Sequence, residues 1–131
     1  MLDAGATTCW ETFEQDSRSR CHAWSATPFY ECLAELAGIC PQEYKDRMIV
    51  MRPRMDLLES LDTASATVWG MARISWQRKN DIVELSLQIP EGARARLELP
   101  HGFQAGASGN APGIHQVLSP GQHKISVSIK Q

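Results

Sequence analysis

A change of hydrophobic period near residue 40 constrains this chain more than any other feature of its sequence. From Ser25 to Gly38, just before that point, apolar residues recur every three or four positions, and after it they alternate with polar residues. The first spacing places apolar side chains along one face of a helix, and the second places them on one face of a strand. The sequence therefore predicts a short helical part followed by a β domain.

The helical pattern runs from Ser25 to Gly38. Ser25 or Thr27 can cap the first turn, Pro28 is tolerated there, and Gly38 suits the left-handed residue that ends many helices. The residues expected on its apolar face are Phe29, Cys32, Leu33, Leu36 and Ala37. Because this face is large for a helix with no helical partner, we expect it to cover another part of the molecule.

The remainder of the chain predicts a small antiparallel β-sandwich, so the fold class is mainly β. The expected strands are 47–52, 67–77, 82–89, 94–99, 114–118 and 122–130, with a further short one between Pro100 and Gly113. Turn residues separate them and no helical pattern intervenes, which is typical of a sandwich. We expect Trp76 in the core beside Ile74, and we expect the last two strands to form a hairpin.

Charge and cysteine spacing exclude several classes of partner. A formal net charge of -2 gives no electrostatic reason to expect nucleic acid or an anionic membrane. No apolar run approaches the ~20 residues of a membrane span, and no secretory signal is visible. No two of the cysteines at 9, 21, 32 and 40 are as close as the about two to four residues that separate paired zinc ligands. We expect no metal, no cofactor and mostly buried free thiols, and the compartment, periplasmic or cytoplasmic, stays open.

The chemistry is concentrated in the first part of the chain. The β-branched pair Thr7-Thr8 disfavours a helix, so we expect a loop that presents Trp10 and Glu11, followed by a solvated polar loop at 14–20. A carboxylate beside an indole, with His22 nearby, has the composition of a sugar-binding cleft, because imidazole and carboxylate hydrogen-bond vicinal hydroxyls. The same residues also fit a plainer interpretation, an exposed acid and a structural histidine.

Several runs of residues resemble one known family. These are GATTCWE at 5–11, SRCHAWSATPFYECL at 19–33, LAGICP at 36–41, a strand that ends in MRP and another that ends in ISW. Together they resemble the C-terminal end of glycoside hydrolase family 78, the α-L-rhamnosidases. The resemblance covers most of residues 3–99, and the first forty residues carry its most specific part.

The resemblance implies both an architecture and a reaction. Residues 1–41 would be the last piece of an (α/α)6 catalytic barrel, and residues 42–131 would be the C-terminal sandwich. The family hydrolyses terminal α-L-rhamnosides with inversion, in which one carboxylic acid protonates the leaving oxygen and a second carboxylate activates water. Glu11 matches the general base, and His22, Trp10 and Trp24 match substrate-binding positions. The implied partner is a rhamnose-containing carbohydrate, provided that the barrel is present.

The sequence also departs from the family. The interval from Glu11 to His22 is short, and the general acid is absent, so we expect the isolated chain to be inactive. Without a barrel, residues 1–40 would fold back on the sandwich, pack against a second copy through the exposed helix, or be mobile. The alternative function is a non-catalytic module, either structural or carbohydrate-binding with Trp69 as an exposed platform.

Overall fold

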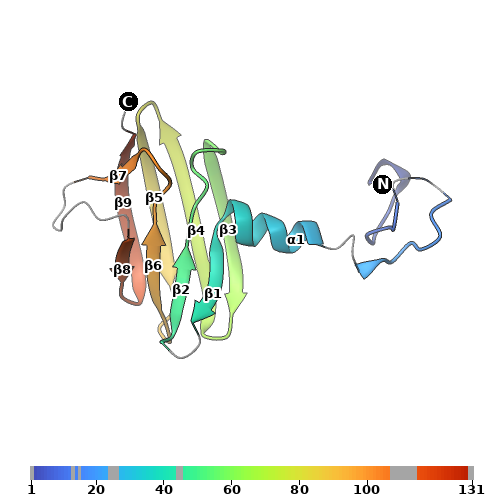
Figure 1. Ribbon diagram of the computed structural model, residues 1–131, viewed down its shortest axis with the longest axis horizontal. Coiled ribbons are helices and arrows are strands. Elements are labelled where there is room, and N and C mark those ends of the chain that lie inside the picture. The colour runs from blue at the N-terminus through green and yellow to red at the C-terminus, as the bar shows by residue number, and fades with distance from the viewer. Residues whose placement is uncertain are drawn as a thin grey trace. The chain divides into compact units, whose positions relative to one another are not determined.

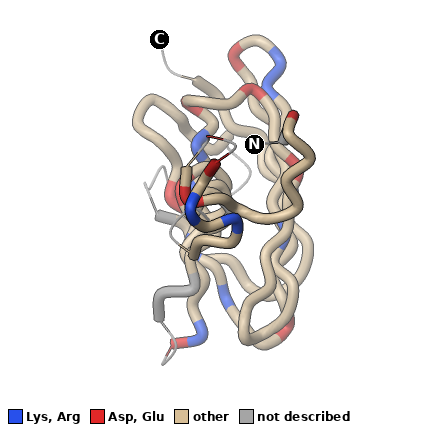
Figure 2. The backbone as a smooth tube through the Cα atoms, turned by 90° about the vertical axis from the view of Figure 1, so that its right-hand side faces the viewer, with Lys and Arg blue, Asp and Glu red and all other residues tan. Residues whose placement is uncertain are grey.

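The computed structural model describes residues 2–12, 14, 16–23, 27–43, 46–106 and 115–129 (Figure 1). The chain divides into two compact units, Met1–Cys32 and Leu33–Gln131. Acidic and basic residues are interspersed along both of them (Figure 2).

The first unit has little regular structure. A 3-10 turn, Leu2–Ala4, opens it, and the short helix α1, Thr27–Glu31, ends it. A π-helical turn, Cys32–Leu36, continues directly from α1, so the one helix expected over 25–38 is shorter and changes its winding at Cys32. Ser25, a candidate cap, lies outside the described residues. We find no signal in the sequence for the π turn.

Gly38 ends this helical segment in the left-handed region, with φ 70°, as its position predicted. The residue also makes a close backbone approach, because the Gly38 carbonyl accepts a hydrogen bond of 2.9 Å from the Arg52 amide. A Cβ atom at this position would lie 2.1 Å from the Arg52 carbonyl oxygen. Glycine is therefore required twice here, for its dihedral angle and for its lack of a side chain.

The second unit is a β-sandwich of two sheets, which confirms the expected fold class. The four-stranded sheet has, in order, β1 (Ile39–Glu43), β2 (Met48–Met51), β6 (Arg94–Glu98) and β8 (His115–Leu118). The five-stranded sheet has β3 (Ser60–Thr67), β4 (Gly70–Lys79), β5 (Ile82–Ile89), β9 (Gly121–Ile129) and β7 (Phe103–Ala105). Every ladder is antiparallel except β2–β6, which is parallel because β3, β4 and β5 of the other sheet separate these two strands in sequence.

The core lies between the inner faces of the two sheets. Its largest fully buried side chains include Ile49, Met51, Met55, Ile74, Leu85, Leu87 and Leu97. Trp76 is buried as predicted, and its indole N–H donates a 3.0 Å hydrogen bond to the Leu58 carbonyl. The period-2 pattern therefore identified the buried face of β4 correctly.

The strand expected over 67–77 is confirmed from Gly70 onward as part of β4, but its first residues form a hairpin turn. Thr67 pairs with Gly70, so Val68 and Trp69 form the two-residue turn, and the strand proper begins at Gly70. Strand β3 was not predicted, because its sequence of small and polar residues has no strong apolar alternation. Trp69 is half-buried and packs against the core, so it is not the exposed platform that a carbohydrate-binding module would require.

The hairpin expected at the C-terminus is wrong. Strand β8 pairs with β6 and β9 pairs with β5 and β7, so consecutive strands belong to different sheets. Leu118 and Val127 are both buried in the same core cluster, one from each sheet. The pattern of alternation was right, but burial against the core decided the pairing partner, which a strand's own sequence does not specify.

The cysteines differ from expectation, because none of the four is fully buried. Cys21 and Cys32 are exposed, and Cys9 and Cys40 are half-buried. Burial raises the pKa of the Cys40 thiol, which donates a weak hydrogen bond to the Ala34 carbonyl. In the described part of the chain, no cluster of three or more potential ligands could hold a metal ion. No helix of that part is long and apolar enough to cross a membrane.

Candidate functional site

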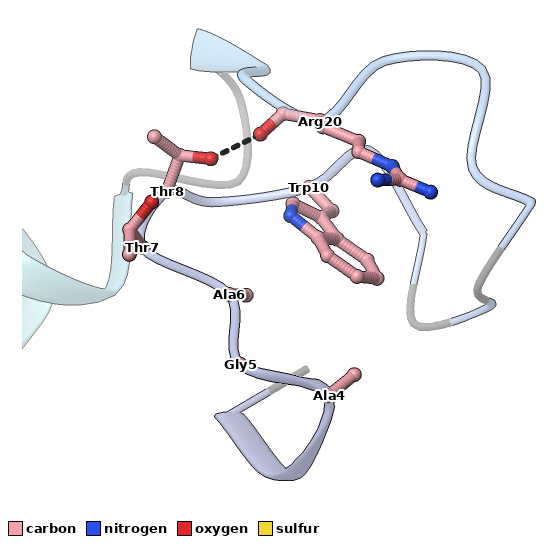
Figure 3. A pocket seen from close by; sticks show the side chains of 7 residues that line it. All are labelled: Ala4, Gly5, Ala6, Thr7, Thr8, Trp10 and Arg20. Atoms are coloured by element: carbon pink, nitrogen blue, oxygen red, sulfur yellow. Dashed lines mark hydrogen bonds between the residues drawn. The ribbon is translucent and has the colours of Figure 1, made fainter.

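Two backbone segments of the first unit run beside each other and position the residues of interest. The Glu11 amide donates to the Ser19 carbonyl at 2.9 Å, and the His22 amide donates to the Cys9 carbonyl at 2.8 Å. The Thr8 hydroxyl adds a hydrogen bond to the Arg20 carbonyl (Figure 3). The expected loop is thus folded back on itself, and it brings residues 9–11 next to residues 19–22.

The two backbone bonds enclose unequal lengths of chain. One residue, Trp10, lies between Cys9 and Glu11, whereas Arg20 and Cys21 lie between Ser19 and His22. An extra residue on one side of an antiparallel pair re-aims the side chains around it. Here the Arg20 guanidinium lies over the Trp10 ring, with its central carbon 5.2 Å from the ring centroid. This is the geometry of a cation–π contact.

A hollow of about 570 Å³ opens beside this pair. It is lined by Ala4, Gly5, Ala6, Thr7, Thr8, Trp10 and Arg20 (Figure 3). Trp10 itself is only 7% exposed, and the Arg20 guanidinium lies over one side of its ring.

Glu11 is held by Arg18. The Arg18 side chain donates two hydrogen bonds to the carboxylate, at 3.0 and 2.5 Å, one to each oxygen. The hydrogen bonds from Arg18 are the main cause that holds the pKa of Glu11 below its ordinary value. Desolvation opposes them as the second-largest cause, and the nearby charges of Arg18 and His22 make smaller contributions that lower the pKa. Glu11 is therefore ionised at neutral pH.

The structure brings three of the four predicted site residues into one folded loop. Trp10 lines the hollow, Glu11 follows it in the chain, and His22 is close enough for its charge to affect the Glu11 carboxyl. Trp24, the fourth, lies outside the described residues. No observation tests the catalytic and binding roles assigned to these residues, and those roles stay predictions.

The sequence interpretation missed the two arginines. Residues 14–20 were expected to be a solvated loop, and Arg18 is indeed highly exposed, but its guanidinium binds Glu11 and that of Arg20 covers Trp10. The available signal was the Arg-Ser-Arg spacing, which places two cations on the same side of an extended segment. It becomes informative only when the segment is known to fold back on Trp10 and Glu11.

Comparison with known proteins identifies the sandwich. A family model for the bacterial alpha-L-rhamnosidase C-terminal domain matches residues 38–111, more than half of the 131-residue chain. The match begins at Gly38, which precedes β1, and covers most of the strands described above. No curated protein matches the chain.

Three solved structures share the fold. The α-L-rhamnosidase from Dictyoglumus thermophilum is 19% identical with a TM-score of 0.76, covering 98% of this chain and 17% of that enzyme. The Streptomyces avermitilis enzyme, complexed with L-rhamnose, is 23% identical with a TM-score of 0.66, covering 98% and 14%. The Aspergillus terreus enzyme is 22% identical with a TM-score of 0.61, covering 82% and 12%.

This chain therefore spans less than a fifth of the length of the solved enzymes that it resembles. At these identities the likeness shows a shared fold, and the family model shows the relationship. The resemblance inferred from the sequence is confirmed for the sandwich. The chain belongs to the bacterial α-L-rhamnosidase C-terminal domain family.

Proposed function

We propose that this chain works as the C-terminal part of an inverting α-L-rhamnosidase, with Glu11 as the general base. The observation that carries the proposal is the position of Glu11 in the folded loop, directly after Trp10 and close enough to His22 for the two groups to interact electrostatically, with its carboxylate ionised at neutral pH. An ionised carboxylate is what a base needs in order to activate water. The family membership of the sandwich supplies the reaction class.

In this proposal Arg18 releases Glu11 in the working enzyme. A general base is most effective when its pKa lies near the working pH, and the pair with Arg18 lowers the pKa of Glu11. The Arg18 side chain is 81% exposed, so swinging it into water disturbs no packing. A sugar, or a neighbouring part of the enzyme, would take its place.

The general acid is supplied by another part of the parent enzyme. In inverting hydrolysis the two carboxyls flank the sugar about 6.5–9.5 Å apart, and one group cannot protonate the leaving oxygen and activate water on opposite faces at once. Glu14 and Asp16 share the loop with Glu11, but both are exposed to solvent. We therefore propose that the 131-residue chain does not turn over substrate by itself.

The first experiment incubates the purified chain with an aryl α-L-rhamnoside. No release of the aryl group above background is expected. Turnover that disappears in Glu11→Gln would mean that the chain alone holds a complete active site, and the proposed inactivity would then be wrong.

The second experiment tests the base. The chain replaces the matching C-terminal segment of the Streptomyces avermitilis enzyme, and Glu11→Gln is compared with Glu14→Gln, an acid in the same loop. We expect Glu11→Gln to lower kcat by about 10²- to 10⁴-fold, with Glu14→Gln close to the unsubstituted chimera. NMR of the first-formed anomer tests inversion. Equal activity of both variants would remove Glu11 from the mechanism.

For the sandwich we propose a structural role in the parent enzyme. Trp69, the candidate platform for sugar binding, packs against the core from the β3–β4 turn. No other aromatic residue lies on the outer face of β4 or β5, where the exposed residues are polar or aliphatic. A flat sugar platform needs such rings, so the structural alternative is favoured over the carbohydrate-binding one.

A further inference from the structure

The edge strands of the two sheets differ in their protection against pairing with another chain. Strand β1 carries Pro41 and a bulge between Pro41 and Glu43, and β7 and β8 have three and four residues. Prolines, bulges and short length are the devices by which proteins blunt a sheet edge. Strand β3 has eight residues without proline or lysine, and all eight pair with β4 in continuous register. Among the described residues, β4 is its only strand neighbour.

The register shows which backbone groups of β3 face outward. The Arg78 amide donates a 2.7 Å bond to the Glu59 carbonyl, and hydrogen-bonded pairs recur at every second residue of an antiparallel ladder. The odd-numbered residues from Glu59 to Thr67 thus direct their backbone groups toward β4. The residues that direct them away from the sheet are Ser60, Asp62, Ala64 and Ala66.

The side chains of β3 permit another strand to approach. Its central residues are small, and its one charged residue, Asp62, is already paired with Arg73 through hydrogen bonds of 3.0 and 2.8 Å. An inward-pointing charge or an edge lysine would oppose pairing, and β3 has neither. The edge is therefore long, regular and nearly neutral.

We propose that β3 is an interface at which two copies of this chain pair antiparallel, with a two-fold axis at Thr63. In this register Ser60 meets Ala66 of the second copy, and Asp62 meets Ala64. The four residues of each strand whose backbone groups point away from the sheet then all have a hydrogen-bonding partner in the second copy. No other two-fold register pairs all four. Two acids never face each other directly, so the like-charge penalty is avoided.

The exposed apolar residues around β3 favour a second copy over an unrelated strand. Val68 and Met71 are 69% and 54% exposed at one end of the strand, and Leu57 is 58% exposed before its other end. Antiparallel self-pairing places the first end of each copy beside the second end of the other. In such an isologous interface, Val68 and Met71 of each copy lie near Leu57 of the other, so the same apolar contact forms twice. Because one edge pair buries a small area, the dimer should be weak and concentration-dependent.

Cysteine cross-linking tests the register in the full chain, with the four native cysteines replaced by serine. Residues on a two-fold axis at a non-hydrogen-bonded position have Cβ atoms about 4.5–5.5 Å apart, close enough for a disulfide. We expect Thr63→Cys to form a covalent dimer on mild oxidation. Leu61→Cys and Ser65→Cys should each stay monomeric alone and cross-link when mixed, because residue 61 faces residue 65. A folded Thr63→Cys variant that stays monomeric would overturn the proposal.

A lysine on the edge gives a second, independent measurement. Sedimentation velocity of the unmodified chain should show a dimer at high concentration, which Ala66→Lys abolishes, because residue 66 faces Ser60 of the second copy and the edge lysine has no acid directly opposite it. Ser126→Lys is the matched control, since it adds the same charge to the same face of the sheet, opposite Glu84 on β5 and away from the β3 edge. Circular dichroism confirms that both variants fold. A dimer that survives in Ala66→Lys, or a chain that is monomeric at every concentration, contradicts the proposal.

Discussion

The loop unit, residues 2–32, and the sandwich that follows it differ in the kind of contact that stabilises each of them internally. In the loop unit, Trp10 is the one buried hydrophobic residue among those described, and the other contacts are hydrogen bonds, a cation–π pair and an exposed ion pair. In the sandwich, side chains from both sheets form one continuous apolar cluster. The predicted chemistry thus lies in the part with the fewest buried contacts.

Because of this difference, we expect side-chain substitutions to change folding stability more in the sandwich than in the loop unit. Apolar burial dominates folding stability, whereas exposed hydrogen bonds and ion pairs contribute little net free energy. Local opening costs least where few apolar contacts are buried. The sandwich therefore sets the stability of the chain, and the loop unit depends on its environment for a defined geometry.

The largest effect is expected from the sandwich core. Ile74 is fully buried on β4, so Ile74→Ala should lower the free energy of unfolding by about 2–5 kcal/mol. Met71, on the same strand but 54% exposed, provides the control, and Met71→Ala should change stability by less than about 0.5 kcal/mol. Denaturant unfolding followed by tryptophan fluorescence measures both. Equal losses would mean that the two sheets do not pack as described.

A smaller effect is expected from the ion-paired cluster on the four-stranded sheet. Glu98, whose side chain is 15% exposed, accepts hydrogen bonds from Arg52 and from Arg96, the latter at 2.9 Å. Glu98→Gln should cost about 1 kcal/mol at neutral pH, because each arginine loses a partly exposed, charge-assisted hydrogen bond.

The pH dependence of this cluster gives the control. The hydrogen bond from Arg52 is the main cause that lowers the pKa of Glu98 below its ordinary value. Its stabilisation is therefore complete above the unfolded-state pKa of a glutamate and is lost as the pH falls through the lower folded-state pKa. The gap between the original chain and Glu98→Gln should close in acid. A gap that persists unchanged would show that packing, not charge, is responsible.

The smallest effect on stability is expected in the loop unit, where the readout is a pKa. Arg18→Ala should raise the pKa of Glu11 toward its ordinary value, since the hydrogen bonds from Arg18 are the main cause of the low pKa. NMR titration of the Glu11 carboxyl carbon measures the shift, and Arg54→Ala serves as a control because Arg54 pairs with Asp56. An unchanged Glu11 titration in Arg18→Ala would mean that the ion pair does not form in solution.

The sequence predicted burial well wherever the hydrophobic period of a segment determines which of its faces is buried. The alternation around Ile74 and Trp76, the full extent of strand 82–89 and the left-handed Gly38 were all legible, because each depends on a few neighbouring residues. The motif around Trp10 and Glu11 pointed to the rhamnosidases, and the family model confirmed this relationship through the sandwich.

Other features could not be read from local pattern. Strand β3 has too few apolar residues for its sequence to predict a strand. It pairs with β4 along its whole length, and Leu61 packs on the core. The C-terminal hairpin failed because the choice of partner for β8 and β9 depends on the whole sandwich. The arginines of the loop unit acquired partners only when the chain folded back on itself.

The class of fold, the buried face of most strands and the family could thus be read from the amino-acid sequence. The neighbours of each strand, the unprotected edge and the cation that reaches Glu11 became known only from the folded chain. Hydrophobic period is a local property, set by backbone geometry within a few residues. Strand order and ion pairing join residues that are distant in the chain, and their choice depends on everything else that must be buried at the same time.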